Sequence, residues 1–136
     1  MVSPATYVTQ AASVDLFVIR SSELTLTRSS NPRIRQFASA MIAAHKGTAS
    51  QLSFAGRRLD LLPPANMLPQ HQAMMEELAA SGDFDRAYVR LQRSVHGAAF
   101  SLHSNYAVRG GSPTLRPVAR NAAAIERSHL DMLRRL

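Results

Sequence analysis

The sequence predicts an all-α protein, an up-and-down four-helix bundle with an additional short helix in the crossover between its two halves. Apolar residues recur at intervals of three and four over four long stretches, which is the spacing of one helical face. No stretch alternates apolar and polar residues between Asn-Gly or Asp-Gly turns, so strands are not expected. The 136 residues suffice for one hydrophobic core, and we expect a single domain over residues 1–136.

The first predicted helix runs from about Pro4 to Arg28 and carries Asp15 near the middle of its apolar face. The rest of that face is formed by Val8, Ala11, Ala12, Ile19 and Leu26. The helix must end before Pro32, because a residue that precedes proline avoids the helical conformation. A connection this short makes the next helix fold back antiparallel to the first.

The second predicted helix, residues 32 to about 58, places His45 inside its apolar stripe. Asn31 is suited to cap its N-terminus, and Pro32 fits the first helical position. The stripe consists of Ile34, Phe37, Ala38, Met41, Leu52 and Ala55. A polar ring there must find a partner, since an unsatisfied buried polar group costs about 1 to 3 kcal/mol.

A crossover follows, because residues 60–69 contain three prolines. A short helix is expected over about Gln70 to Ala80, and Asp83 can cap a long helix that ends near Arg109. The predicted core face of that long helix is Phe84, Ala87, Tyr88, Leu91, Val95, Ala98, Leu102 and Tyr106.

The last predicted helix begins after Ser112, which is expected to cap it, with Pro113 at the first position. Its apolar stripe alternates by three and four residues and contains one histidine, His129. The stripe is Leu115, Val118, Ala122, Ile125, His129, Met132 and Leu136.

Four polar residues, three in the centres of these stripes and His96 toward the edge of its own, are predicted to share one layer of the bundle. We expect the turns near residues 31 and 111 to lie at the same end. Counted from there at 1.5 Å per residue, Asp15, His45, His96 and His129 fall within about 6 Å of one level. They belong to four different helices.

Three histidines and a carboxylate at one level form a ligand set for a divalent transition metal, with zinc the favoured ion. Glu126 lies one turn before His129 and completes a Glu-x-x-His element of the kind found in di-iron bundles. The corresponding positions before His45 and His96 are Ile42 and Arg93, so a complete di-iron site is not expected. The predicted metal site is therefore His45, His96, His129, Asp15 and Glu126.

An alternative is a buried polar network without metal, in which Asp15 pairs with His45 or His129. His103 is explained by a position at the edge of its helix face, and His71 is expected to be exposed at the start of the short helix. The six methionines are interpreted as core residues.

The composition excludes several classes of function. No cysteine is present, which rules out thiolate ligands and disulfides, and neither a Gly-x-Ser-x-Gly element nor a Gly-rich phosphate loop occurs. The net charge is +7, but the arginines are scattered and no nucleic-acid-binding motif accompanies them, so no nucleic acid partner is expected. No run is long and apolar enough for a transmembrane segment, and no signal peptide is evident.

Several segments together resemble a family of exported bacterial ferritin-like proteins that is classed as a domain of unknown function, whose members are often labelled predicted outer-membrane proteins. The similarity spans most of the chain and is carried by the order and spacing of these segments. They are residues 7–12, Asn31-Pro32, Phe37-Ala38, residues 41–45, residues 82–88, His96 and His129-Leu130.

The resemblance implies a helical bundle in the periplasm or envelope, with an export signal upstream of Met1 already removed, and no established reaction. His45, His96 and His129 match the family pattern. Members typically have an acidic residue where this chain has Ala44, and commonly a glutamate where it has Val18.

We therefore expect an exported ferritin-like bundle that binds a divalent metal and has no catalytic activity of its own. The alternative is a basic interaction module for an anionic surface or a protein partner, associated with the envelope or a membrane surface, in which the histidines are structural.

Overall fold

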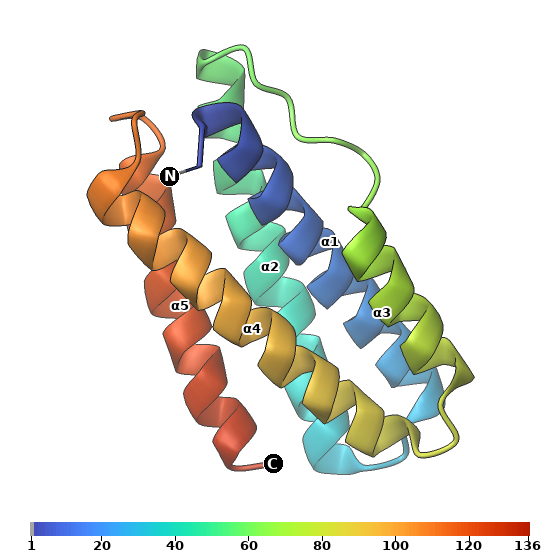
Figure 1. The fold of residues 1–136 in the computed structure, drawn as a ribbon. Coiled ribbons are helices and arrows are strands. Elements are labelled where there is room, and N and C mark those ends of the chain that lie inside the picture. Colours follow the sequence, from blue (N-terminus) through green and yellow to red (C-terminus); the bar gives the residue numbers. More distant parts are fainter. Residues whose placement is uncertain (1) are drawn as a thin grey trace.

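Five helices make up the fold in a computed structural model, which describes residues 2–136 (Figure 1). Met1, the first residue of the predicted single domain, lies outside these residues. The helices are α1 (Pro4–Arg28), α2 (Pro32–Arg58), α3 (Pro69–Ala80), α4 (Phe84–Arg109) and α5 (Arg116–Arg134), and residues 2–136 contain no strand. The prediction of an all-α protein with four long helices and one short one is confirmed.

The start of α2 follows the prediction, whereas the start of α5 does not. Asn31 Oδ1 accepts hydrogen bonds from the backbone N–H groups of Arg33 and Ile34, at 3.0 and 3.4 Å. The Ser112 carbonyl accepts from two successive backbone N–H groups, so residues 113–115 form a turn and α5 begins at Arg116. The reason is Pro117, which has no N–H to extend the helical ladder back to Pro113.

The start of α4 corresponds to the prediction only in part. Asp83 occupies the N-cap position, but its side chain makes no capping hydrogen bond.

The C-terminus of α2 is a Schellman motif that fixes where the crossover leaves the bundle. The N–H groups of Leu61 and Asp60 donate to the carbonyls of Gly56 and Arg57, at 2.8 and 3.2 Å. Asp60 adopts a left-handed conformation with φ of 60°. A Cβ atom at Gly56 would lie 2.3 Å from the Leu61 carbonyl oxygen, so this position requires glycine.

The four long helices pack as two antiparallel pairs, α1 with α2 and α4 with α5, and α3 lies against α1 and α4 (Figure 1). The rings of Tyr7 and Tyr106 stack with centroids 4.2 Å apart, while Ser22 Oγ lies 2.7 Å from Tyr88 Oη at the other end of α1. Helices α1 and α4 are therefore antiparallel, and α2 and α4 run in the same direction.

Two topological expectations are consequently wrong. The α1–α2 and α4–α5 turns lie at opposite ends of the bundle, and the four long helices do not alternate strictly up and down (Figure 1). The cause is the crossover, since residues 59–68 and α3 carry the chain back along the bundle before α4 begins. The residues of the predicted layer still lie at one level. Reversing a helix does not move them away, because they lie near the middle of α1, α2 and α4, and 13 residues into α5.

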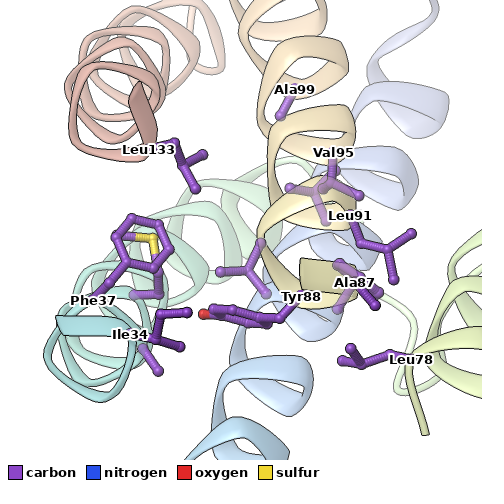
Figure 2. Close-up of a cluster of buried hydrophobic side chains, with 14 of the residues drawn as sticks. Ile34, Phe37, Leu78, Ala87, Tyr88, Leu91, Val95, Ala99 and Leu133 are labelled. Atoms are coloured by element: carbon purple, nitrogen blue, oxygen red, sulfur yellow. The ribbon is translucent and has the colours of Figure 1, made fainter. Parts of the chain in front are cut away.

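The hydrophobic core consists of two clusters at opposite ends of the bundle. The larger includes Phe37 and Tyr88, whose rings meet edge to face with centroids 6.2 Å apart (Figure 2). The smaller cluster surrounds Tyr7 and Tyr106 at the end that holds the α4–α5 turn. A layer of buried polar side chains separates the two clusters.

Two helices expose faces slightly different from those predicted. In α4, Ala99 and His103 are buried, while Ala98 is exposed and Leu102 is half-buried. Because α4 packs against α1 on one side and α5 on the other, its buried stripe turns toward Ala99 and His103 after His96. In α1, Ile19 and Leu26 are only half-buried.

The buried stripe of α5 has the predicted spacing but is rotated. It consists of Leu115, Ala119, Ala122, Glu126, His129 and Leu133, while Val118, Ile125 and Met132 are half-buried. The small side chains of Ala119 and Ala122 face the neighbouring helices, and the rotation turns Glu126 into the interior.

Candidate metal centre

The buried polar layer brings together four metal-ligating side chains from three helices: His45 of α2, His96 of α4, and Glu126 and His129 of α5. Their exposed fractions range from 0% to 6%. The three imidazole centroids form a nearly equilateral triangle with sides of 5.3 to 5.4 Å. One ligating atom from each residue lies within 4.8 Å of those from the other three.

Hydrogen bonds on the outer side of the layer orient two of these rings. His45 Nδ1–H donates to Asp15 Oδ1 at 2.9 Å, and Thr48 Oγ1 donates to the same oxygen at 2.8 Å. His96 Nδ1–H donates to the main-chain carbonyl of Gln92 at 2.8 Å. Both rings therefore direct Nε2 inward, as histidines do when a carboxylate or carbonyl supports them behind a metal.

Asp15, which we predicted as a ligand, lies behind His45 and outside the group of four converging donors. It accepts a hydrogen bond from the candidate ligand His45 and is not itself one of the converging residues. The supporting groups of Thr48 and Gln92 were missed. The signal for Thr48 is its position one turn after His45, whereas a backbone carbonyl leaves no signal in a sequence.

Each of the four converging residues has one buried polar atom without a hydrogen-bond partner: His45 Nε2, His96 Nε2, His129 Nδ1 and Glu126 Oε2. His45 Nε2 is 3.1 Å from Glu126 Oε1 but is not aligned for a hydrogen bond, and His129 Nδ1 lies 3.8 Å from that oxygen. Buried polar atoms normally find partners, at a cost of about 1 to 3 kcal/mol when they do not. All four residues therefore have unused capacity to bind a ligand or an ion.

His45 lies between the carboxylates of Asp15 and Glu126, which set its charge. Burial alone would lower the pKa of this histidine, but the carboxylates of Asp15 and Glu126 on its two sides outweigh burial and raise the pKa to about 9. Burial also opposes ionisation of Glu126, yet His45 and the neighbouring imidazoles hold the pKa of its carboxyl below the usual value. Without metal, His45 is thus a cation between two carboxylates.

The other two histidines of the layer are neutral. Burial lowers the pKa of His96, and burial together with the nearby charge of His45 lowers the pKa of His129 to about 4. Neutral imidazoles have a lone pair free for a metal. His96 and His129 are therefore ready to bind a cation at neutral pH, whereas His45 must first lose a proton.

The remaining histidines lie outside the group. His71 was expected to be exposed, but it is 8% exposed because α3 packs on α1, where its Nδ1 lies 2.5 Å from Ser13 Oγ. His103 is 5% exposed, and its Nδ1 lies 2.8 Å from Tyr7 Oη. His103 is therefore buried, and the prediction that it lies at the edge of its helix face is wrong.

The basic residues form no separate site among residues 2–136. All of them are exposed except Arg116, which is half-buried, and they are distributed over the four long helices. Two are paired with acids, Arg90 with Glu77 and Arg134 with Asp131. None of the helices formed by residues 2–136 has the length and apolar character needed to cross a membrane.

Fold and site together define an all-α helical bundle whose interior holds a cluster of three imidazoles and one carboxylate. The chain belongs to the DUF4142 family, a domain of unknown function, whose model matches residues 2–136. No curated protein matches the sequence significantly.

Two solved proteins have a similar fold. CopM in its Cu(II)-bound form is 16% identical, with a TM-score of 0.82 over 99% of this chain and 95% of CopM. CopM structures with Cu(I) and with Ag match as well. A DUF305 fragment from Deinococcus radiodurans is 15% identical, with a TM-score of 0.84 over 98% of this chain and 94% of the fragment. At these identities the likeness concerns the fold.

Proposed function

We propose that this protein binds one transition-metal ion inside its bundle through His45, His96, His129 and Glu126, with Asp15 positioning His45. The single observation that carries the proposal is that four buried residues each offer a ligating atom within 4.8 Å of those of the other three. Each of these residues also has a buried polar atom without a hydrogen-bond partner among the described residues. The copper- and silver-bound forms of CopM support the proposal through the similarity of the fold.

The donor chemistry favours a divalent ion of intermediate softness. Imidazole nitrogens and a carboxylate oxygen suit Zn²⁺ and Cu²⁺, and no cysteine thiolate is present to select Cu⁺. Zn²⁺ holds nitrogen and oxygen ligands at about 2.0 to 2.2 Å in a tetrahedron. The donors, now within 4.8 Å of one another, would have to draw closer to adopt that geometry. We propose Zn²⁺ as the physiological ion and Cu²⁺ as its strongest competitor.

The proposed site holds a metal ion rather than using one in catalysis. Four protein ligands fill a tetrahedral sphere, whereas catalytic zinc sites keep a position for water or substrate. We therefore propose a role in metal storage, transfer or protection, without catalytic activity. We further propose that the chain is one ferritin-like domain and that it is exported, as its resemblance to exported proteins implies.

Titration of metal-free protein tests this function. Protein purified without a metal-affinity tag is titrated with Zn²⁺ and with Cu²⁺, and one ion per chain is expected. The double substitution of His96 and His129 by Ala removes two of four ligands and should abolish stoichiometric uptake. His103→Gln, a change at a buried histidine outside the cluster, serves as the control and should retain one ion. If the double variant still binds one ion tightly, the assigned site is wrong.

A further inference from the structure

The groove between α1 and α2 points to the path by which a metal ion reaches the buried cluster. It has a volume of about 220 Å³. The crossover, which runs from α2 to α3 (Figure 1), contributes Pro63 and Pro64 to its lining. Its walls come from both helices: Ala12, Asp15, Leu16 and Ile19 of α1, and Ala49, Leu52 and Ser53 of α2. The groove is mostly apolar, and Asp15 is its only charged lining residue.

A much smaller cavity adjoins this groove, and the two share Asp15 and Leu52 as lining residues. Its volume of about 10 Å³ is close to the room that one water molecule needs. Glu126, the carboxylate of the metal cluster, also lines this small cavity. The groove therefore adjoins, at Asp15 and Leu52, a cavity that a candidate metal ligand lines.

We infer that metal ions enter and leave the cluster through this groove, passing between Asp15 and Leu52 into the small cavity and on to Glu126. The route presupposes the proposed metal site. Asp15 supplies a carboxylate where the groove meets the small cavity, and Glu126 supplies a second one in that cavity. Both favour a cation over an anion. The small cavity has room for only about one water molecule. The ion must therefore lose most of its hydration shell beside Asp15 before it enters.

Leu52 separates the two compartments and is 2% exposed, so passage requires its side chain to move. Asp15 Oδ1 is already engaged by His45 and Thr48, which holds the carboxylate in place at the junction. Exchange through such a path is slower than exchange at an open site, while the affinity is set by the four ligands.

A bulky group attached in the groove tests the entry route separately from the metal site. The chain has no cysteine, so Ser53→Cys introduces a single thiol on the groove wall, which N-phenylmaleimide then caps with a bulky group. Ser50→Cys, three residues earlier on the exposed side of α2, receives the same cap as the matched control. Uptake and release of Zn²⁺ are followed by stopped flow with a chelating dye.

We expect the cap at position 53 to slow both uptake and release at least tenfold, with a Kd within twofold of the capped control. Rates within twofold of the control would overturn the route and direct attention to the side of the layer near His129. A chain that takes up no Zn²⁺ before capping would overturn the metal site itself, and the route with it.

A second variant tests the same route without the cap, so that misfolding of the capped protein cannot be mistaken for a blocked path. Ala49→Phe fills the same groove without chemical modification, and Ala98→Phe adds the same ring on the exposed side of α4. Slowing by Ala49→Phe alone supports the route, whereas equal rates in the two variants contradict it.

Discussion

His45 lies 2.9 Å from Asp15, through a hydrogen bond from its Nδ1 to the carboxylate across the α1–α2 interface. This bond fixes which ring nitrogen faces the interior, and it keeps His45 positively charged until something replaces the proton on Nε2. The same pair therefore affects the strength of metal binding and its dependence on pH.

Asp15→Asn should weaken Zn²⁺ binding by about 10- to 100-fold, the usual effect of losing the carboxylate behind a ligating histidine. Asn retains the shape but not the charge, so His45 becomes a poorer ligand while the fold is preserved. Competition with a chelator measures the change in Kd. Asp131→Asn removes an exposed carboxylate of α5 and should have little effect. Equal losses in the two variants would mean that Asp15 contributes only to the overall charge.

Metal binding should release a proton at neutral pH. The pKa of His45 is about 9 in the folded protein without metal, so Zn²⁺ must displace the proton from Nε2. Affinity should rise about tenfold per pH unit up to about pH 9 and then level off, because His45 is already neutral above that pH. Calorimetry in buffers of different ionisation enthalpy measures the released protons. An affinity that is constant from about pH 7 to about pH 9 would contradict the charged state of His45.

His71 should make the metal-free protein sensitive to acid. Burial lowers its pKa in the folded state, so below about pH 6.5 the unfolded chain binds more protons at this residue than the folded one. Its contribution to stability is present above that pH and is lost as the pH falls toward the lowered pKa. Urea unfolding at about pH 7.5 and about pH 5 should show a smaller loss of unfolding free energy for His71→Asn than for the parent. Equal losses would show that His71 does not titrate differently on folding.

Gly56→Ala should destabilise the fold, because its Cβ would meet the carbonyl of Leu61, the residue whose N–H closes the end of α2. A cost of about 1 to 3 kcal/mol in unfolding free energy is expected for such a clash. Gly47→Ala is the matched control in the same helix, where an added Cβ meets nothing within 4 Å. That change should stabilise the helix by up to about 1 kcal/mol. Thermal unfolding compares the two, and destabilisation by both would argue against a specific clash at Gly56.

The sequence carries strong local signals for most helices and for the histidines of the layer. Asn31-Pro32 marks the start of α2 through capping and proline geometry, and the three-four spacing around His45 requires that ring to point inward. These signals depend on neighbouring residues alone. They can therefore be recognised without knowledge of the other helices.

What could not be predicted depends on contacts between helices. Ile125 is the more hydrophobic choice for the core face of α5, yet Glu126 is buried because the imidazoles of other helices compensate its charge. His71 has no apolar pattern around it and is buried only because α3 packs on α1. The direction of α4 depends on how far the crossover travels, which proline-rich composition does not specify.

The separation of the hydrophobic core into two clusters has a consequence for the alignment of the helices. Alanine-rich faces such as that of α5 could pack almost as well after a helix slid along its axis by one turn, about 5.4 Å. A shift of α5 would carry Glu126 away from His45, and a shift of α2 would carry His45 away from both Asp15 and Glu126, so either would leave charged groups unpaired in the interior. Among the ways these helices could fit together, the polar layer thus selects one axial register, much as a single buried asparagine does in a coiled coil.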